Sequence, residues 1–89
     1  MMVMENEFER QIEQLFAAEE LAELWDEIMD AYSNDQIDKA RTLLNQLLEE
    51  NPDFSRAYLM LGNIALKEED SEEAIMQFQR ALDAASRIL

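Results

Sequence analysis

The sequence contains no cysteine and no histidine, and it has a single glycine and a single proline. The absence of cysteine excludes disulfides, thiolate metal sites and thiol catalysis. The absence of histidine removes the side chain that enzymes use most often for proton transfer. Because so few of the 89 residues favour tight turns and β-branched residues are sparse, we expect one small all-α protein.

Basic residues are also scarce, with 7 lysines and arginines against 21 acids and a net charge of −14. Phosphate backbones and anionic lipid repel such a chain, so nucleic acid and membranes are poor partners, whereas basic peptides stay open. Ten of the acids and only one base lie in residues 1–33, which makes this third the anionic end. The chain lacks a secretory signal and a bilayer-spanning apolar run, so we expect a cytoplasmic protein.

The remaining polar residues do not suggest catalysis. The hydroxyl residues are scattered, and the sequence has no glycine-rich phosphate loop. The acidic cluster between Glu19 and Asp30 could in principle hold a cation, but it has neither a glycine-containing ligand loop nor a histidine. We interpret it as a solvated helix face, and we predict no enzymatic activity, no cofactor and no metal site.

Apolar residues recur at spacings of three and four, which predicts a series of amphipathic helices. Residues 5–33 contain no breaker, and whether they form one helix or two stays open, because a repeat fold would favour a break near residues 17–20. A second helix should end before Asn51-Pro52. Two more follow, one from about residue 55 to 67 and one from about 71 onward. The expected helix caps are Ser33-Asn34-Asp35, then Asp53 or Ser55, then Asp70 with Glu73 in capping-box spacing.

The strongest signal is an internal repeat with a period of 34 residues. Three positions of the second helix recur in the fourth one period later, as Ala40 and Ala74, Leu44 and Phe78, and Leu47 and Ala81. Together with Leu61-Gly62, this pattern resembles the tetratricopeptide repeat, a helix-turn-helix unit of 34 residues.

The resemblance implies an alignment for each copy. It puts Tyr58 at the family's tryptophan position in the second copy and Trp25 there in the first. On that alignment Met29 replaces the glycine, which would hold the first two helices further apart, and the first turn would be one residue shorter than usual.

The fold implied by the resemblance is a stack of antiparallel helical hairpins in a short right-handed superhelix, with an extra helical segment at the amino terminus. We expect residues 1–19 to form this acidic segment and residues 20–89 the two-repeat domain, divided into 20–53 and 54–89.

In the family, the first helix of each hairpin lines a groove that binds peptides, and such a groove would here suit a basic and apolar peptide. Trp25 could be an exposed anchor for a partner, but we favour a place between the helices of its own hairpin. The resemblance implies seven groove residues: Asp26, Glu27, Asp30, Leu59, Met60, Asn63 and Leu66.

The third helix is hydrophobic nearly all round, so something else must cover it. Repeat arrays ordinarily need about three units and a cap with a polar outer face, and the sequence stops within its last hairpin. Either the amino-terminal helix folds back as a cap or two chains cover each other, and we favour a homodimer. Its predicted interface consists of Ile75, Leu82, Ile88 and Leu89.

The leading hypothesis is therefore a non-catalytic adaptor or scaffold that binds a protein or peptide. Two alternatives stay open. One is a small dedicated chaperone for an aggregation-prone client, either secreted or assembling, and the other is a purely structural homo-oligomer.

Overall fold

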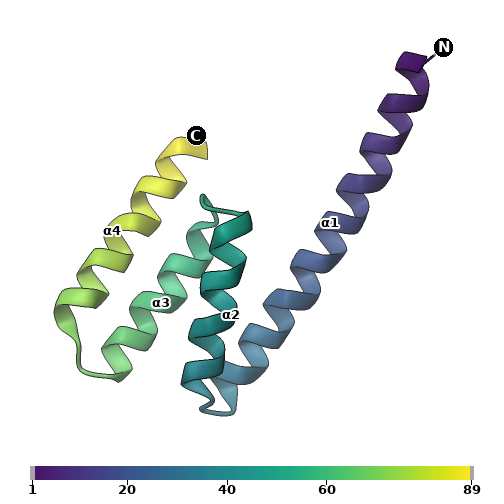
Figure 1. The fold of residues 1–89 in the computed structure, drawn as a ribbon. Coiled ribbons are helices and arrows are strands. Elements are labelled where there is room, and N and C mark those ends of the chain that lie inside the picture. The colour runs from purple at the N-terminus through teal and green to yellow at the C-terminus, as the bar shows by residue number, and fades with distance from the viewer. Residues whose placement is uncertain (1, 89) are drawn as a thin grey trace.

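The computed structural model describes the backbone of residues 2–88 and the side chains of residues 9–12, 15 and 17–87. Within these residues the chain forms α1 (Met2–Ser33), α2 (Ile37–Glu50), α3 (Ser55–Lys67) and α4 (Ser71–Ile88). Helix α1 pairs with α2 and α3 pairs with α4, and the two hairpins stack through α2 and α3 (Figure 1). The all-α fold of stacked helical hairpins is thus confirmed.

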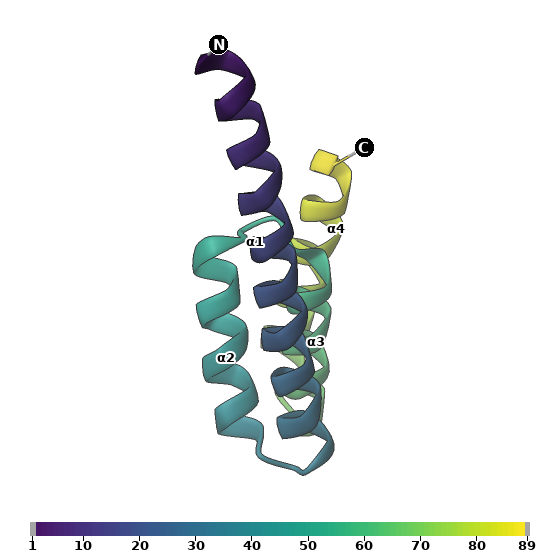
Figure 2. The ribbon, with the colours of Figure 1, turned by 90° about the vertical axis from the view of Figure 1, so that its right-hand side faces the viewer.

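Helix α1 is a single helix of 32 residues, whereas α2 has only 14. The chain continues helical through Ala17 to Glu20, as expected for strong helix formers without a breaker, so the one-helix alternative is right. The amino-terminal part of α1 extends beyond the end of α2 (Figures 1 and 2). The expected division at residues 19 and 20 therefore coincides with no break in the backbone, and it stays a prediction.

The turns within the two hairpins have the same structure. Asp35 and Glu69, one repeat period apart, both have a φ of 61°. The backbone N–H of Gln36 donates to the carbonyl of Ala31 at 2.8 Å, and that of Asp70 donates to Ala65 at 2.8 Å. The first turn is therefore as long as the second, and the expectation of a shorter one is wrong.

The equivalent turns also correct the alignment of the first copy. The equivalent of Tyr58 is Leu24 rather than Trp25, and Ile28 rather than Met29 stands at the position of Gly62. At Gly62 an added Cβ would lie only 2.3 Å from the ring of Phe78, so α3 and α4 approach closely there. Ile28, fully buried, fills the corresponding place in the first hairpin.

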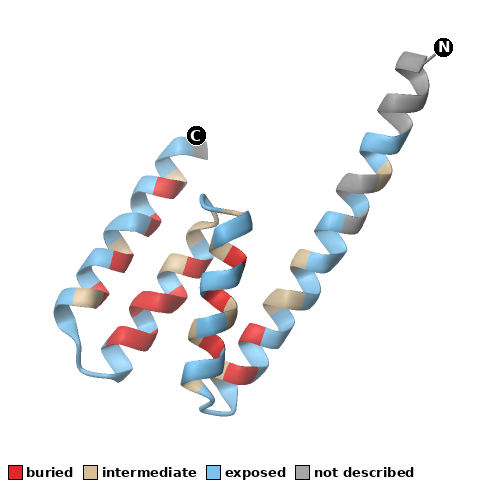
Figure 3. Cartoon of the chain, in the orientation of Figure 1, coloured by how far each residue is buried: buried red, intermediate tan, exposed pale blue. Residues whose placement is uncertain are grey.

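The buried residues lie along the facing sides of the helices (Figure 3). The repeated positions Ala40, Leu44 and Leu47 are all fully buried, as the period predicted. Helix α3 packs against α2 on one flank and against α4 on the other, which explains why it is apolar nearly all round. The main core cluster consists of Ile28, Ala31, Ala40, Leu44, Leu47, Ala57, Met60, Leu61 and Ile64.

Only one of the three predicted side-chain caps forms. The backbone N–H of Glu73 donates to the Asp70 carboxylate at 3.2 Å, which confirms the cap of α4. Helices α2 and α3 instead begin after Gln36 and Phe54, and neither of these makes a side-chain cap. Tight turns and packing set these two starts, because Gln36 is held by the turn and Phe54 packs against the core.

Candidate protein-interaction surface

Side chains of α1 contact the second hairpin directly. The ring of Trp25 meets Phe54 edge to face, with centroids 5.4 Å apart and planes at 88°. Further along α1, the Lys67 ammonium lies 5.0 Å from the Tyr32 ring centroid and 3.2 Å from the Asp35 carboxylate. Trp25 is therefore packed against the core, as favoured, rather than exposed as an anchor, and its ring also contacts Phe54 of the next repeat.

Helix α2 holds the same end of α3. The Arg41 guanidinium donates hydrogen bonds to the carboxylates of Glu68, at the end of α3, and Asp38. The bond to Glu68 is the main cause that raises the pKa of Arg41 above its ordinary value, so the guanidinium stays charged. Leu48, two turns beyond Arg41 on the same face of α2, is partly buried against the core. The first repeat thus contacts the second through Trp25, Tyr32 and Arg41, and Leu48 packs against the core that the two repeats share.

The same four positions in the second repeat form an uncovered apolar surface, which we call the end face. One period after Trp25 and Tyr32 stand Leu59 and Leu66 of α3, and one period after Arg41 and Leu48 stand Ile75 and Leu82 of α4. In the first repeat these positions adjoin the second hairpin, whereas no described helix covers them in the second. The exposed fractions of the end face are 46% for Leu59, 53% for Leu66, 57% for Ile75 and 71% for Leu82.

The opposite end of the array is acidic. Helix α3 buries Ala57, Met60 and Ile64, and one period earlier α1 carries Glu23, Asp26 and Asp30, all exposed. We call these three carboxylates the acidic end. A helix packed there would remove them from water without a partner, which is strongly unfavourable. The first repeat therefore carries the polar outer face that a terminal repeat needs.

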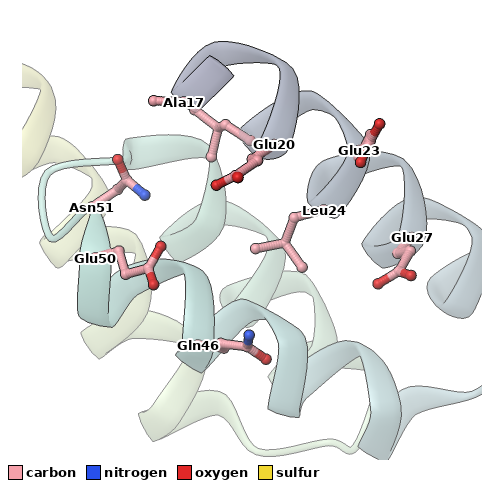
Figure 4. A pocket seen from close by; sticks show the side chains of 9 residues that line it. Ala17, Glu20, Glu23, Leu24, Glu27, Gln46, Glu50 and Asn51 are labelled. Carbon is pink, nitrogen blue, oxygen red and sulfur yellow. The ribbon is translucent and has the colours of Figure 1, made fainter. Parts of the chain in front are cut away.

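A cleft of about 530 Å³ lies between α1 and α2, near the carboxyl end of α2 (Figure 4). Leu24 points between the two helices, and carboxylates of both helices surround the opening. Toward its amino end, α1 diverges from α2 (Figure 1). Its lining residues are Ala17, Glu20, Leu21, Glu23, Leu24, Glu27, Gln46, Glu50 and Asn51.

Comparison with known proteins agrees with this architecture. A family profile described as tetratricopeptide repeat matches residues 26–87, more than half of the chain. The chain belongs to the tetratricopeptide repeat family. The Caenorhabditis elegans tetratricopeptide repeat-containing protein trd-1 is 39% identical over 57 residues, which is 63% of this chain but 7% of that relative. The chain thus spans a small part of the relative's length, and no solved structure matches it significantly.

Tetratricopeptide repeats generally mediate contacts between proteins and are typically non-catalytic. Among the residues that the structure describes, no cluster of three or more acidic side chains could hold a metal ion. None of the helices in this part of the chain combines the length and the apolar character needed to cross a bilayer.

The predicted groove residues of this repeat protein lie on several surfaces. Asp26 and Asp30 belong to the acidic end, and Glu27 lines the cleft. Met60 is only 8% exposed, because it packs in the core between the hairpins. Leu59, Asn63 and Leu66 are exposed on α3, so Met60 is the one predicted groove residue that the core buries.

The two predicted interfaces meet at the end face. Leu59 and Leu66 come from the predicted groove, and Ile75 and Leu82 come from the predicted oligomer interface. The Ile88 side chain and Leu89 lie outside the described residues. The residues 34 positions after Trp25 and Tyr32 are Leu59 and Leu66, so the repeat period predicts this surface from the sequence. It does so only when the first copy is aligned in the register that the turns show.

Proposed function

We propose that this protein is a non-catalytic interaction module, an adaptor or scaffold, which binds an amphipathic helix of a protein partner on its end face. The single observation that carries the proposal is the exposure of Leu59, Leu66, Ile75 and Leu82, between 46% and 71% each. The equivalent side of the first repeat adjoins α3, so a helix has the right shape for this surface. The cytoplasmic location expected from the sequence stays part of the proposal.

The chemistry of the ligand follows from α3. This helix meets the first repeat with Ala57, Met60 and Ile64, which are small or apolar residues at spacings of three and four. Covering the exposed half of four aliphatic side chains contributes about 1 kcal/mol each. A total of about 4 kcal/mol corresponds to a dissociation constant on the order of 1 mM, and association itself opposes binding, so we expect a short helix to bind weakly.

A synthetic peptide with the sequence of residues 54–68 tests the proposal, since it reproduces the helix that packs on the first repeat. We expect saturable binding, measured by fluorescence anisotropy of the labelled peptide against purified protein. Charged substitutions on the end face, Ile75→Glu and Leu82→Glu, should abolish it, because binding would then bury a carboxylate.

Met76→Glu is the matched control, because Met76 is 44% exposed on α4 but does not belong to the end face. A second control is the same peptide with Met60→Glu and Ile64→Glu. The proposal fails if the wild-type protein does not bind the peptide, or if Met76→Glu weakens binding as much as Ile75→Glu does.

A dedicated chaperone is the second candidate, and the exposed aliphatic character of the end face favours it as well. A chaperone would hold an unfolded client through this surface and would suppress aggregation of that client. Suppression that Leu82→Glu removes, with no binding of the helical peptide, would favour the chaperone over the adaptor. A structural homo-oligomer uses the same surface for self-association, which the next subsection develops.

A further inference from the structure

We propose that the helix covering the end face belongs to a second copy of this chain, so that two copies pair end face to end face about a two-fold axis. This inference rests on the proposed function, because it names the ligand of the same surface. The contact would bring Leu59, Leu66, Ile75 and Leu82 of one copy against the same residues of the other.

The distribution of charge favours this pairing. The four residues of the end face are aliphatic, so two such faces meet without burying a charge within the patch. The chain carries a net charge of −14, and the carboxylates Glu23, Asp26 and Asp30 project from the opposite end of the array. Pairing through the end faces keeps the two acidic ends as far apart as two copies allow, which minimises their repulsion.

A head-to-tail arrangement is excluded by the same residues. It would place Leu59 and Ile75 of one copy against Glu23 and Asp26 of the next copy. Within one chain, the equivalent contact between the two repeats is made by Ala57 and Met60, which carry no charge. Burying these carboxylates without basic partners costs more than the aliphatic contact returns. A closed two-fold pair covers the aliphatic end faces and leaves the acidic ends in water, whereas an open filament would bury the acidic ends and does not form.

The pair also meets the general needs of a repeat array. Two copies stack four repeats in a row, above the about three that such arrays require for stability. Each outer end of the four-repeat array is then an acidic end, which supplies the polar outer face that terminal repeats need.

The absence of cysteine makes disulfide trapping a direct test, since any introduced cysteine is the sole thiol in the chain. In a parallel pair of α4 helices Leu82→Cys should crosslink to itself under mild oxidation, and in an antiparallel pair it should crosslink to Ile75→Cys of another copy. Met76→Cys on α4 and Asp26→Cys at the acidic end are the controls, and neither should crosslink. Crosslinks between Leu82→Cys and Asp26→Cys would indicate head-to-tail contact and would overturn the inference.

Sedimentation equilibrium measures the association itself. We expect a wild-type dimer, at least about 100-fold weaker association for Leu82→Glu, and unchanged association for Met76→Glu. Circular dichroism checks that each variant stays helical. Salt should strengthen the dimer because it screens two acidic chains, whereas it would weaken binding of a basic peptide.

The two proposals can fail separately. A wild-type protein that stays monomeric at about 0.5 M salt, where repulsion is largely screened, overturns the dimer. If that monomer still binds the peptide of residues 54–68, the proposed adaptor function stands. If it binds neither itself nor the peptide, both proposals fail.

Discussion

The two hairpins fill one pair of equivalent core positions with side chains of different size. In the second, Gly62 lies under the ring of Phe78, and a Cβ there would lie 2.3 Å from that ring. In the first, Ile28 and Leu44 stand at these positions, and both are fully buried. The first hairpin therefore has a large side chain on its first helix, at Ile28, where the second hairpin has none, at Gly62.

This difference predicts a coupled pair of substitutions. Gly62→Ile alone should lower the free energy of unfolding by about 3 kcal/mol or more, because it inserts a branched side chain into a filled space. Adding Phe78→Leu recreates the pair found in the first hairpin and should recover part of that loss. Urea unfolding of the wild type, both single variants and the double variant gives the coupling energy. Purely additive effects would show that the two positions do not share one space.

The sequence predicted the repeated positions well but not their register in the first copy. The 34-residue period correctly placed Ala40, Leu44 and Leu47 in the core, because small and branched aliphatic residues recur there. The alignment failed at Trp25, where an aromatic residue was matched to an aromatic position of the family. Similar side chains need not occupy equivalent positions. Only the geometry of the backbone turn distinguishes two alignments of the repeats that differ by one residue.

At the scale of the helical hairpins, the two turns share a geometry that their residues do not favour. Asp35 and Glu69 both adopt a φ of 61°, where a side chain with a Cβ is strained and glycine is not. Aspartate tolerates this region better than glutamate does. Asp35 is also within 3.2 Å of the Lys67 ammonium, so it makes a contact across the two repeats that a glycine would lose.

Glycine substitutions in the turns should therefore stabilise the protein unequally. We expect Glu69→Gly to raise the free energy of unfolding by about 1 kcal/mol, since it relieves the strain of the left-handed conformation. Asp35→Gly should gain less, because aspartate is less strained and the pair with Lys67 is lost. Glu72→Gly, inside the first turn of α4, is the control and should destabilise by up to about 1 kcal/mol. Urea midpoints check all three, and an equal gain at both turns would contradict this account.

At the scale of the whole molecule, the two ends of the array differ in chemistry. One end presents Glu23, Asp26 and Asp30, and the other presents the aliphatic end face. The net charge of −14 opposes the compact state through self-repulsion. Ion pairs such as those of Lys67 and Arg87 are largely exposed and contribute little against this repulsion.

Stability should accordingly rise with salt. We expect a higher urea midpoint at about 0.5 M than at about 10 mM sodium chloride, since the Debye length falls from about 30 Å to a few ångströms. Leu82→Glu serves as the background, because any dimer would make the midpoint depend on concentration. Neutralising the acidic end with Glu23→Gln, Asp26→Asn and Asp30→Asn should raise the low-salt midpoint and reduce the salt effect. A midpoint that falls with salt would mean that the ion pairs outweigh the repulsion.

The helices, the repeat period, the core stripe and the acidic charge could all be predicted from residue order, because each depends on spacings within one segment. What only the tertiary structure decided was the contact between segments: that Trp25 meets Phe54, that Met60 is core, and that Leu59 and Ile75 are left exposed. Those facts depend on the geometry of the turns and on the sizes of the side chains at positions 28 and 62. A one-residue shift of a helix rotates its side chains by about 100°, which moves a residue from the core to the surface.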